Sequence, residues 1–394
     1  MHRQVLLLAC AQALFQTASV LVMTVGGLAG GMLAPSPELA TAPIAAMFLG
    51  TAVATVPASM WMARAGRRPG FIAGALLGTA GGILAAFGLW IASLLLLSAG
   101  TFLVGAYQGF AQFYRFAAGE VADEAFRPRA ISLVLAGGIV AALLGPLLGR
   151  LGGPLLQPEY VGSFLLLAVV SILAAGILAG LKMPLASQSG VAGTGRPLLG
   201  ILRQPAYLVA LFGAATGYGI MILAMTATPL AMTHHQHPLA DTALVIQLHV
   251  LGMFLPSFFT GTLIARFGVL RIMLAGIALL AGHIAMSLSG TGFTSFAGAL
   301  VLLGVGWNFL YVGGTTLLTT TYSAAERGRA QAANDMTIFA VGLTCSLGAG
   351  ALLQAVGWQT LNLLLLPWLA VAALALLWLG YRRGRRSPQP MSAH

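Results

Sequence analysis

The chain has 394 residues, of which 59% are hydrophobic and only 7% are charged, and its mean hydropathy is +0.93. These values exclude an ordinary soluble domain and predict an all-α integral membrane protein, because lipid is the solvent for most of the surface. Nearly all of the basic residues behind the net charge of +11 lie in loops and at the termini around the apolar segments. We therefore expect membrane lipid as a partner and no nucleic acid.

Six apolar segments form the first half of the chain. The fifth segment contains Gly145 and Gly149, whose small size is expected to allow close helix contact. Charged residues at the polar ends of these segments include Arg115 and Glu120. Arg115 is expected either to pair with Glu120 or to face a central cavity. The predicted helices cover residues 4–27, a stretch ending near 65, then 71–91, 94–119, 131–148 and 160–181.

A second set of six segments follows a long polar interval rich in Gly, Ser and Pro. We therefore divide the chain into a first half (1–181), a linker (182–205), a second half (206–381) and a basic tail (382–394). An internal repeat supports this division, since Arg127-Pro128-Arg129-Ala130 recurs as Arg327-Gly328-Arg329-Ala330. The predicted helices of the second half cover residues 206–232, 243–265, 270–288, 295–319, 332–353 and 358–381.

The distribution of basic residues predicts the topology. All Lys and Arg residues except Arg115 and Arg150 lie in alternate loops or at the two termini, which the positive-inside rule makes cytoplasmic. Both termini are then expected in the cytoplasm. The sequence shows no Ser-His-Asp, nucleotide-binding or paired-carboxylate arrangement, so we expect no enzyme and no permanently bound cofactor.

Two side-chain pairs in the second half have the spacing of one helix face. Met221 and Met225 lie in one apolar segment, and His249 and Met253 lie in the next. Thioether and imidazole ligands suit copper, and an ionisable side chain within a span is a functional candidate. The alternative is structural, because Met often fills gaps in a core and a buried His can be satisfied by a hydroxyl or carbonyl.

The segment that carries the Met pair also contains Gly217, Gly219 and Pro229, which loosen a transmembrane helix. They favour a gating helix that bends, with close packing as the alternative. The turn after this segment holds three His residues at the outer mouth. They are expected to capture metal, although an outer loop rich in His can also be merely polar: His234, His235 and His237.

The loop after the second segment resembles the signature of the major facilitator superfamily, with Arg64, Gly66, Arg67 and Arg68 in matching positions. The resemblance implies twelve transmembrane helices in two six-helix pseudo-repeats, with the substrate path between the halves. It also implies that this loop belongs to a gate, and for Arg115 we expect a gate or structural role. The usual Asp of the signature is Ala63 here, which removes a charge that helps to close the gate in that family.

Within that superfamily, the Met pair followed by the His-Met pair resembles the CcoA-type copper importers of bacterial inner membranes. The resemblance implies a monomeric secondary transporter that imports copper by alternating access and is linked to copper delivery for cytochrome oxidase. Copper is then the transported substrate, held by Met221, Met225, His249 and Met253. A related branch is linked to riboflavin uptake, so the alternative is a transporter of an organic molecule, by riboflavin-like import or drug efflux.

Overall fold

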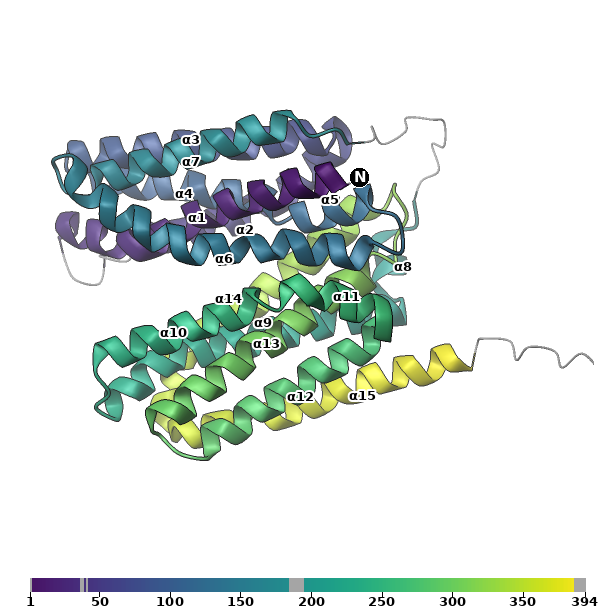
Figure 1. Cartoon of the computed structure of the whole chain (residues 1–394). Coiled ribbons are helices and arrows are strands. Elements are labelled where there is room, and N and C mark those ends of the chain that lie inside the picture. The colour runs from purple at the N-terminus through teal and green to yellow at the C-terminus, as the bar shows by residue number, and fades with distance from the viewer. Residues whose placement is uncertain (1, 36–38, 40–41, 184–194, 386–394) are drawn as a thin grey trace, which may run out of the picture. The chain divides into compact units, whose positions relative to one another are not determined.

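The structure is a computed structural model that describes residues 2–35, 39, 42–183 and 195–385. Its regular elements are all helices (Figure 1), which confirms the predicted all-α class. The first half contains α1 (His2–Leu33), α2 (Ala42–Ala65), α3 (Arg67–Trp90), α4 (Leu94–Ala111), α5 (Tyr114–Val121), α6 (Arg127–Gly152), the 3-10 helix η2 (Gly153–Leu155) and α7 (Val161–Ala179). The second contains α8 (Leu198–Leu202), α9 (Pro205–His234), α10 (Leu239–Phe254), α11 (Ser257–Phe267), α12 (Val269–Leu288), α13 (Phe293–Leu318), α14 (Arg327–Leu363) and α15 (Leu365–Gly384).

Most of these helices are long and apolar enough to cross a membrane. Among the described residues, 11 helical segments meet that requirement by length and composition. The first part of α14, which carries Asn334 and Asp335, covers the remaining predicted helix 332–353. Helices are the expected solution, because a backbone in lipid must satisfy its hydrogen bonds within its own segment.

The chain divides into two compact units that differ slightly from a simple split at the linker. One unit comprises Met1–Arg196 together with Tyr322–Phe339, and the other comprises Pro197–Thr321 together with Ala340–His394. The helix α14 therefore contributes its first residues to the first unit and the remainder to the second. Part of the predicted linker (184–194) and most of the basic tail (386–394) lie outside the described residues.

Small residues hold the helices of the first unit together. A Cβ atom added at Gly105 would overlap the carbonyl oxygen of Met47, so α4 and α2 touch through their backbones. The predicted close contact at Gly145 and Gly149 is confirmed, because both residues pack against valine side chains of α1. In lipid, where apolar side chains gain little by leaving solvent, such close backbone approach is a main source of helix association.

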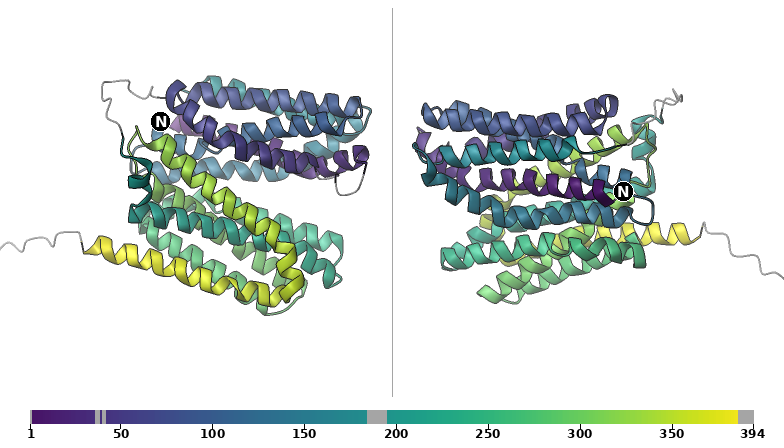
Figure 2. Two further views of the ribbon diagram at one scale, coloured as in Figure 1. Left: turned by 180° about the vertical axis from the view of Figure 1, so that it is seen from behind. Right: turned by 45° about the horizontal axis from the view of Figure 1, so that its top comes forward.

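The second unit is built around α13. Helices α9, α10 and α12 each pack along α13, and Figure 2 shows these green and teal helices from behind and in a tilted view. Close approach again requires glycine, because a Cβ at Gly304 would lie 2.6 Å from the carbonyl oxygen of His249. The part of α10 that carries the predicted ligand pair is thus pressed directly against α13.

Three predicted helices are interrupted in the structure. The predicted helix 94–119 breaks at Gln112–Phe113 into α4 and α5, and the predicted helix 243–265 breaks at Leu255–Pro256 into α10 and α11. The third, the predicted helix 358–381, breaks at Leu364 between α14 and α15. The kink of α14 at Gly357, whose φ is 76°, lies instead between the predicted helices 332–353 and 358–381. At Pro256 the cause is local, since proline has no N–H to donate within a helix.

Candidate functional site

The signature loop between α2 and α3 presents its residues in different directions. Gly66 has a φ of 95°, a conformation that a residue with a Cβ rarely adopts, which explains glycine at this position. Arg64 is exposed, and Arg68 donates a hydrogen bond to the carbonyl oxygen of Ala179 at 2.6 Å. Arg67, by contrast, is only 4% exposed. The buried guanidinium of Arg67 therefore needs partners within the protein.

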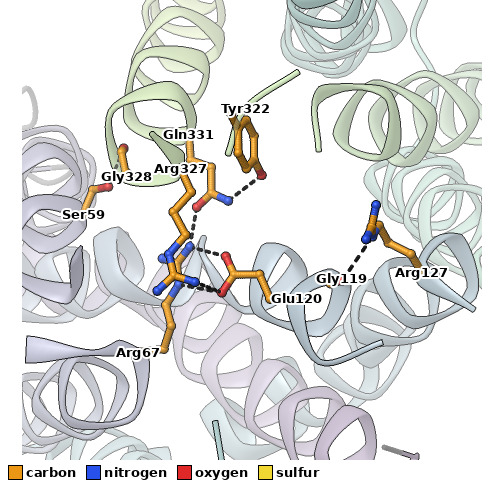
Figure 3. Close-up of polar contacts among 9 residues, drawn as sticks. All are labelled: Ser59, Arg67, Gly119, Glu120, Arg127, Tyr322, Arg327, Gly328 and Gln331. Atoms are coloured by element: carbon orange, nitrogen blue, oxygen red, sulfur yellow. Dashed lines mark hydrogen bonds and ion pairs between the residues drawn. The ribbon is translucent and has the colours of Figure 1, made fainter. Parts of the chain in front are cut away.

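Those partners form a polar group that we call the Arg67 cluster, shown in Figure 3: Arg67, Glu120, Tyr322, Arg327 and Gln331. The Nη2 atom of Arg67 lies 2.7 Å from Oε1 of Glu120 and 2.5 Å from Oε1 of Gln331. Arg327 contacts the other carboxylate oxygen of Glu120 at 3.0 Å. Gln331 also donates to the hydroxyl of Tyr322 at 2.6 Å. One carboxylate thus joins α5 to α3 and to the start of α14.

The position of the missing signature Asp is also defined. Ala63 lies beside the start of α14, where a Cβ added at Gly328 would be 3.2 Å from the Cβ of Ala63. One turn earlier on α2, Ser59 donates a hydrogen bond to the carbonyl oxygen of Gly328 at 2.7 Å. The contact between α2 and the start of α14 is therefore neutral, and the acidic partner of the signature loop comes from α5 as Glu120.

Arg115 forms a buried ion pair with an acidic residue of α14. Its Nη2 atom lies 2.5 Å from Oδ1 of Asp335 on α14, and the exposed fractions of the two side chains are 3% and 1%. Arg115 also donates to Gln112 at 3.1 Å and lies 4.5 Å above the ring of Phe116. Pairing with Glu120 was one of two alternatives predicted for Arg115, and in the structure Glu120 pairs with Arg67 and Arg327.

The end of the linker is anchored to the residues that precede α14. Arg196 contacts both carboxylate oxygens of Glu326 at 2.8 Å, and its backbone N–H donates to the same side chain at 2.9 Å. Glu326 also accepts the N–H of Ser323. The hydrogen bonds from the Arg196 side chain, followed by that of Ser323, hold the pKa of Glu326 well below its ordinary value. The carboxylate therefore stays ionised in acid.

The predicted metal ligands lie on the expected helices. Met221 and Met225 are on α9, while His249 and Met253 are on α10. His249 is fully buried, and its Nδ1 lies 2.9 Å from the carbonyl oxygen of Leu300 on α13. Its Nε2 has no hydrogen-bond partner among the described residues. His249 thus faces α13, and joint ligation of one ion by all four residues stays a prediction.

Two of the three His residues at the end of α9 contact an aromatic side chain of α13. His235 and His237 lie 6.5 and 5.6 Å from the ring of Phe296, and Nε2 of His237 lies 2.7 Å from the carbonyl oxygen of Thr291. The His234 ring packs on that of His235. Across the described part of the chain, no three His, Cys, Asp or Glu side chains gather as a metal site. Metal capture by these His residues remains a prediction.

The residues expected to make α9 flexible have well-defined neighbours. A Cβ at Gly217 would lie 2.9 Å from the Cβ of Leu310 on α13, and one at Gly219 would lie 2.6 Å from the Trp368 side chain on α15. Pro229 lies within α9, which continues to His234. Both glycines therefore serve close packing in this structure. A gating movement of α9 stays a prediction.

An aromatic cluster adjoins the same region of α9 and α13. The Trp307 and Tyr311 rings are stacked, with centroids 4.9 Å apart and an interplanar angle of 15°. Tyr218 of α9 lies 6.3 Å from Tyr311, and Phe254 meets Trp307 edge-on at 5.9 Å. Asn308, the residue after Trp307, contacts Met253, Ser257 and Thr260 at the break between α10 and α11.

Comparison with known proteins identifies the family. The model of the Major Facilitator Superfamily matches residues 6–247 and 209–393, and the chain belongs to this family of secondary transporters. The chain is 41% identical over 379 residues to the riboflavin transporter RfnT of Brucella anthropi, with 95% of both chains covered. It is 32% identical to the uncharacterized transporter YddS of Bacillus subtilis, covering 80% of this chain and 77% of that protein. The protein is therefore a transporter and not an enzyme.

Solved structures confirm the fold. The fucose transporter FucP, described in the outward conformation, superposes with a TM-score of 0.77 at 17% identity and covers 95% of this chain and 98% of its own. The proton:xylose symporter XylE gives a TM-score of 0.78 at 11% identity, with 96% and 95% covered. The predicted fold of twelve helices in two six-helix repeats is thus confirmed.

Proposed function

We propose that this protein imports riboflavin or a closely related flavin across the bacterial inner membrane, with both termini in the cytoplasm. The observation that carries the proposal is the 41% identity to RfnT across nearly the whole of both chains. This likeness favours the organic-substrate alternative over copper, and a riboflavin-like substrate over a drug. A secondary transporter moves such a substrate by alternating access around a site at the midplane.

The aromatic cluster supplies chemistry that suits a flavin. The isoalloxazine ring system is planar and heteroaromatic, so it stacks on aromatic side chains such as Tyr218, which is half-buried on α9. The indole N–H of Trp307 is buried without a hydrogen-bond partner among the described residues. A flavin carbonyl would satisfy this donor. Stacking and one directed hydrogen bond would together favour a flavin over an aliphatic substrate of similar size.

The test is uptake of radiolabelled riboflavin into proteoliposomes that contain the full chain. We expect saturable uptake, and we expect Trp307→Phe to raise the KM because it removes the unsatisfied N–H and part of the stacking surface. A lost hydrogen bond of about 1 kcal/mol corresponds to a rise of about fivefold. Trp378→Phe is the matched control, because Trp378 of α15 is 48% exposed and lies outside the aromatic cluster. Absence of riboflavin uptake by the folded protein would refute the proposal.

Copper remains a second candidate because of one specific observation at His249. With Nδ1–H donated to the carbonyl oxygen of Leu300, the free Nε2 atom carries the lone pair that a metal ion requires. Backbone carbonyls commonly orient metal-binding His residues in this way. Met253, four residues along α10, offers a soft sulfur ligand. The copper alternative retains the proposed link to cytochrome oxidase assembly.

Copper transport is tested in the same vesicles. His283 on α12 provides a matched control, since it is also fully buried and its Nδ1 lies 3.0 Å from the carbonyl oxygen of Ala299. The residue four positions after His283 is Ser287, so α12 lacks the His-Met spacing of α10. If copper is the substrate, His249→Gln abolishes copper uptake and His283→Gln does not. Copper uptake that survives His249→Gln, or no copper uptake at all, would contradict this second candidate.

A further inference from the structure

Asp335 is an unusual residue in this chain. The sequence contains only eight Asp and Glu residues, and Asp335 lies within α14, about two turns after the helix begins at Arg327. Its side chain is 1% exposed. A carboxyl group buried within a membrane protein is costly, so its presence is a reason to look for a function.

The surroundings of Asp335 satisfy only half of the carboxylate. Oδ1 accepts hydrogen bonds from Nη2 of Arg115 at 2.5 Å and from Nδ2 of Asn334 at 2.8 Å. Oδ2 is buried and has no hydrogen-bond partner among the described residues. The chain therefore holds the ionised group through one oxygen and leaves the other oxygen ready to accept a proton.

Other charged and titratable groups act on Asp335 from neighbouring elements. They are Arg67 of α3 and Tyr322 in the segment before α14, in addition to its direct partner Arg115 of α5. The two arginines favour the ionised carboxylate, whereas burial favours the neutral acid. These opposing effects allow a change in the position of Arg115 or in access to water to decide whether Asp335 holds a proton.

Proton uptake and the packing of α14 are linked through Arg115. When Oδ2 accepts a proton from water, a single O–H bond forms and the carboxyl group becomes neutral. Arg115, which is 3% exposed, then no longer faces the negative charge of Asp335, and this weakens the contact between α5 and α14. When Asp335 becomes accessible from the opposite side, the same O–H bond breaks and the proton leaves.

We propose that Asp335 takes up and releases the proton that drives transport, and that Arg115 is the cation whose pairing this proton controls. The proposal rests on membership of a secondary transporter family and holds for any substrate. It assigns proton coupling to one ion pair in the first unit. Asp335 would thus convert a proton gradient into a change in the packing of Tyr322–Phe339 against the rest of the first unit.

The experiment measures riboflavin accumulation in proteoliposomes under an imposed gradient of one pH unit. With one proton moved per substrate, such a gradient supports about tenfold accumulation. We expect the wild-type protein to approach this ratio. Asp335→Asn should only equilibrate the substrate, while still exchanging labelled for unlabelled riboflavin. Asp241→Asn at the start of α10 is the matched control and should accumulate normally.

A second measurement separates this proposal from the identity of the substrate. Infrared difference spectra of the purified protein, recorded during a pH titration, should show a carboxylic acid band that Asp335→Asn removes and Asp241→Asn retains. If riboflavin is not transported but this band is present, the flavin proposal fails and Asp335 keeps its role. Accumulation by Asp335→Asn, or an unchanged band in that variant, would overturn the inference. If Asp335→Asn does not fold, Asp335→Glu should retain both accumulation and the band, and loss of both in a folded Glu variant would also overturn it.

Discussion

Replacing Glu120 by Gln tests whether the Arg67 cluster holds the start of α14 in place. Gln has the same shape but no charge, so Arg67 and Arg327 would lose their shared acidic partner. Removing one partner of a fully buried ion pair costs about 3–5 kcal/mol. Glu120 is 19% exposed and Gln can still accept one hydrogen bond, so we expect a smaller cost of about 2 kcal/mol. This free energy corresponds to a shift of about 30-fold in an equilibrium toward an undocked state, in which Tyr322–Phe339 has separated from the rest of the first unit.

Cysteine accessibility measures that shift. Ser59 is 1% exposed and lies against Gly328, so Ser59→Cys, made in a chain with Cys10 and Cys345 replaced, should be protected from a water-soluble thiol reagent. Adding Glu120→Gln should raise the labelling rate by about 30-fold. Glu124→Gln, an exposed acid nearby, should leave the rate unchanged. Equal protection with and without Glu120→Gln would show that the Arg67 cluster does not hold the start of α14 in place.

Two further predictions concern stability. Gly105→Ala should lower the melting temperature in detergent, because its Cβ would overlap the Met47 carbonyl and overpacking costs about 1–3 kcal/mol, whereas Gly348→Ala, with open space around it, should not. Glu326→Gln should destabilise the protein at neutral pH. Because the pKa of Glu326 is lowered in the folded state, the ionised side chain contributes its full stabilisation at pH values above the pKa of Glu in the unfolded chain, about 4.3. The difference in melting temperature should therefore be constant near neutrality and shrink as the pH falls below that value; a difference that shrinks as the pH rises from neutrality would contradict it.

The membrane fold could be predicted because lipid leaves few alternatives. Apolar runs of sufficient length become helices, and the repeat around Arg127 and Arg327 indicated two related halves. The interruptions were harder to predict. Pro256 is a signal that should have divided the predicted helix 243–265. The break at Gln112–Phe113 contains neither Pro nor Gly, and we find no sequence signal for it.

The candidate sites were predictable only where their residues share a helix. The spacing of His249 and Met253 placed them correctly on one face of α10, but it could not show that this face meets α13. Likewise, Arg67 and Glu120 are 53 residues apart, and the pair Arg115 and Asp335 is 220 apart. Such partners are set by helix packing. The sequence showed each charged residue but not its counter-charge.

The absence of the signature Asp can now be interpreted from charge balance. Arg67 is buried and needs an acidic partner whether or not one is present at Ala63, and Glu120 of α5 provides it permanently from within the first half. Undocking of Tyr322–Phe339 would leave the Arg67–Glu120 pair intact. It would break the contacts that α14 contributes, including those of Arg327, Gly328, Gln331 and Asp335. The contacts that can break and re-form thus lie on α14. Among the described residues, this helix also carries the one buried carboxyl group with an oxygen that has no hydrogen-bond partner. Docking and protonation are therefore expected to be coupled within this helix.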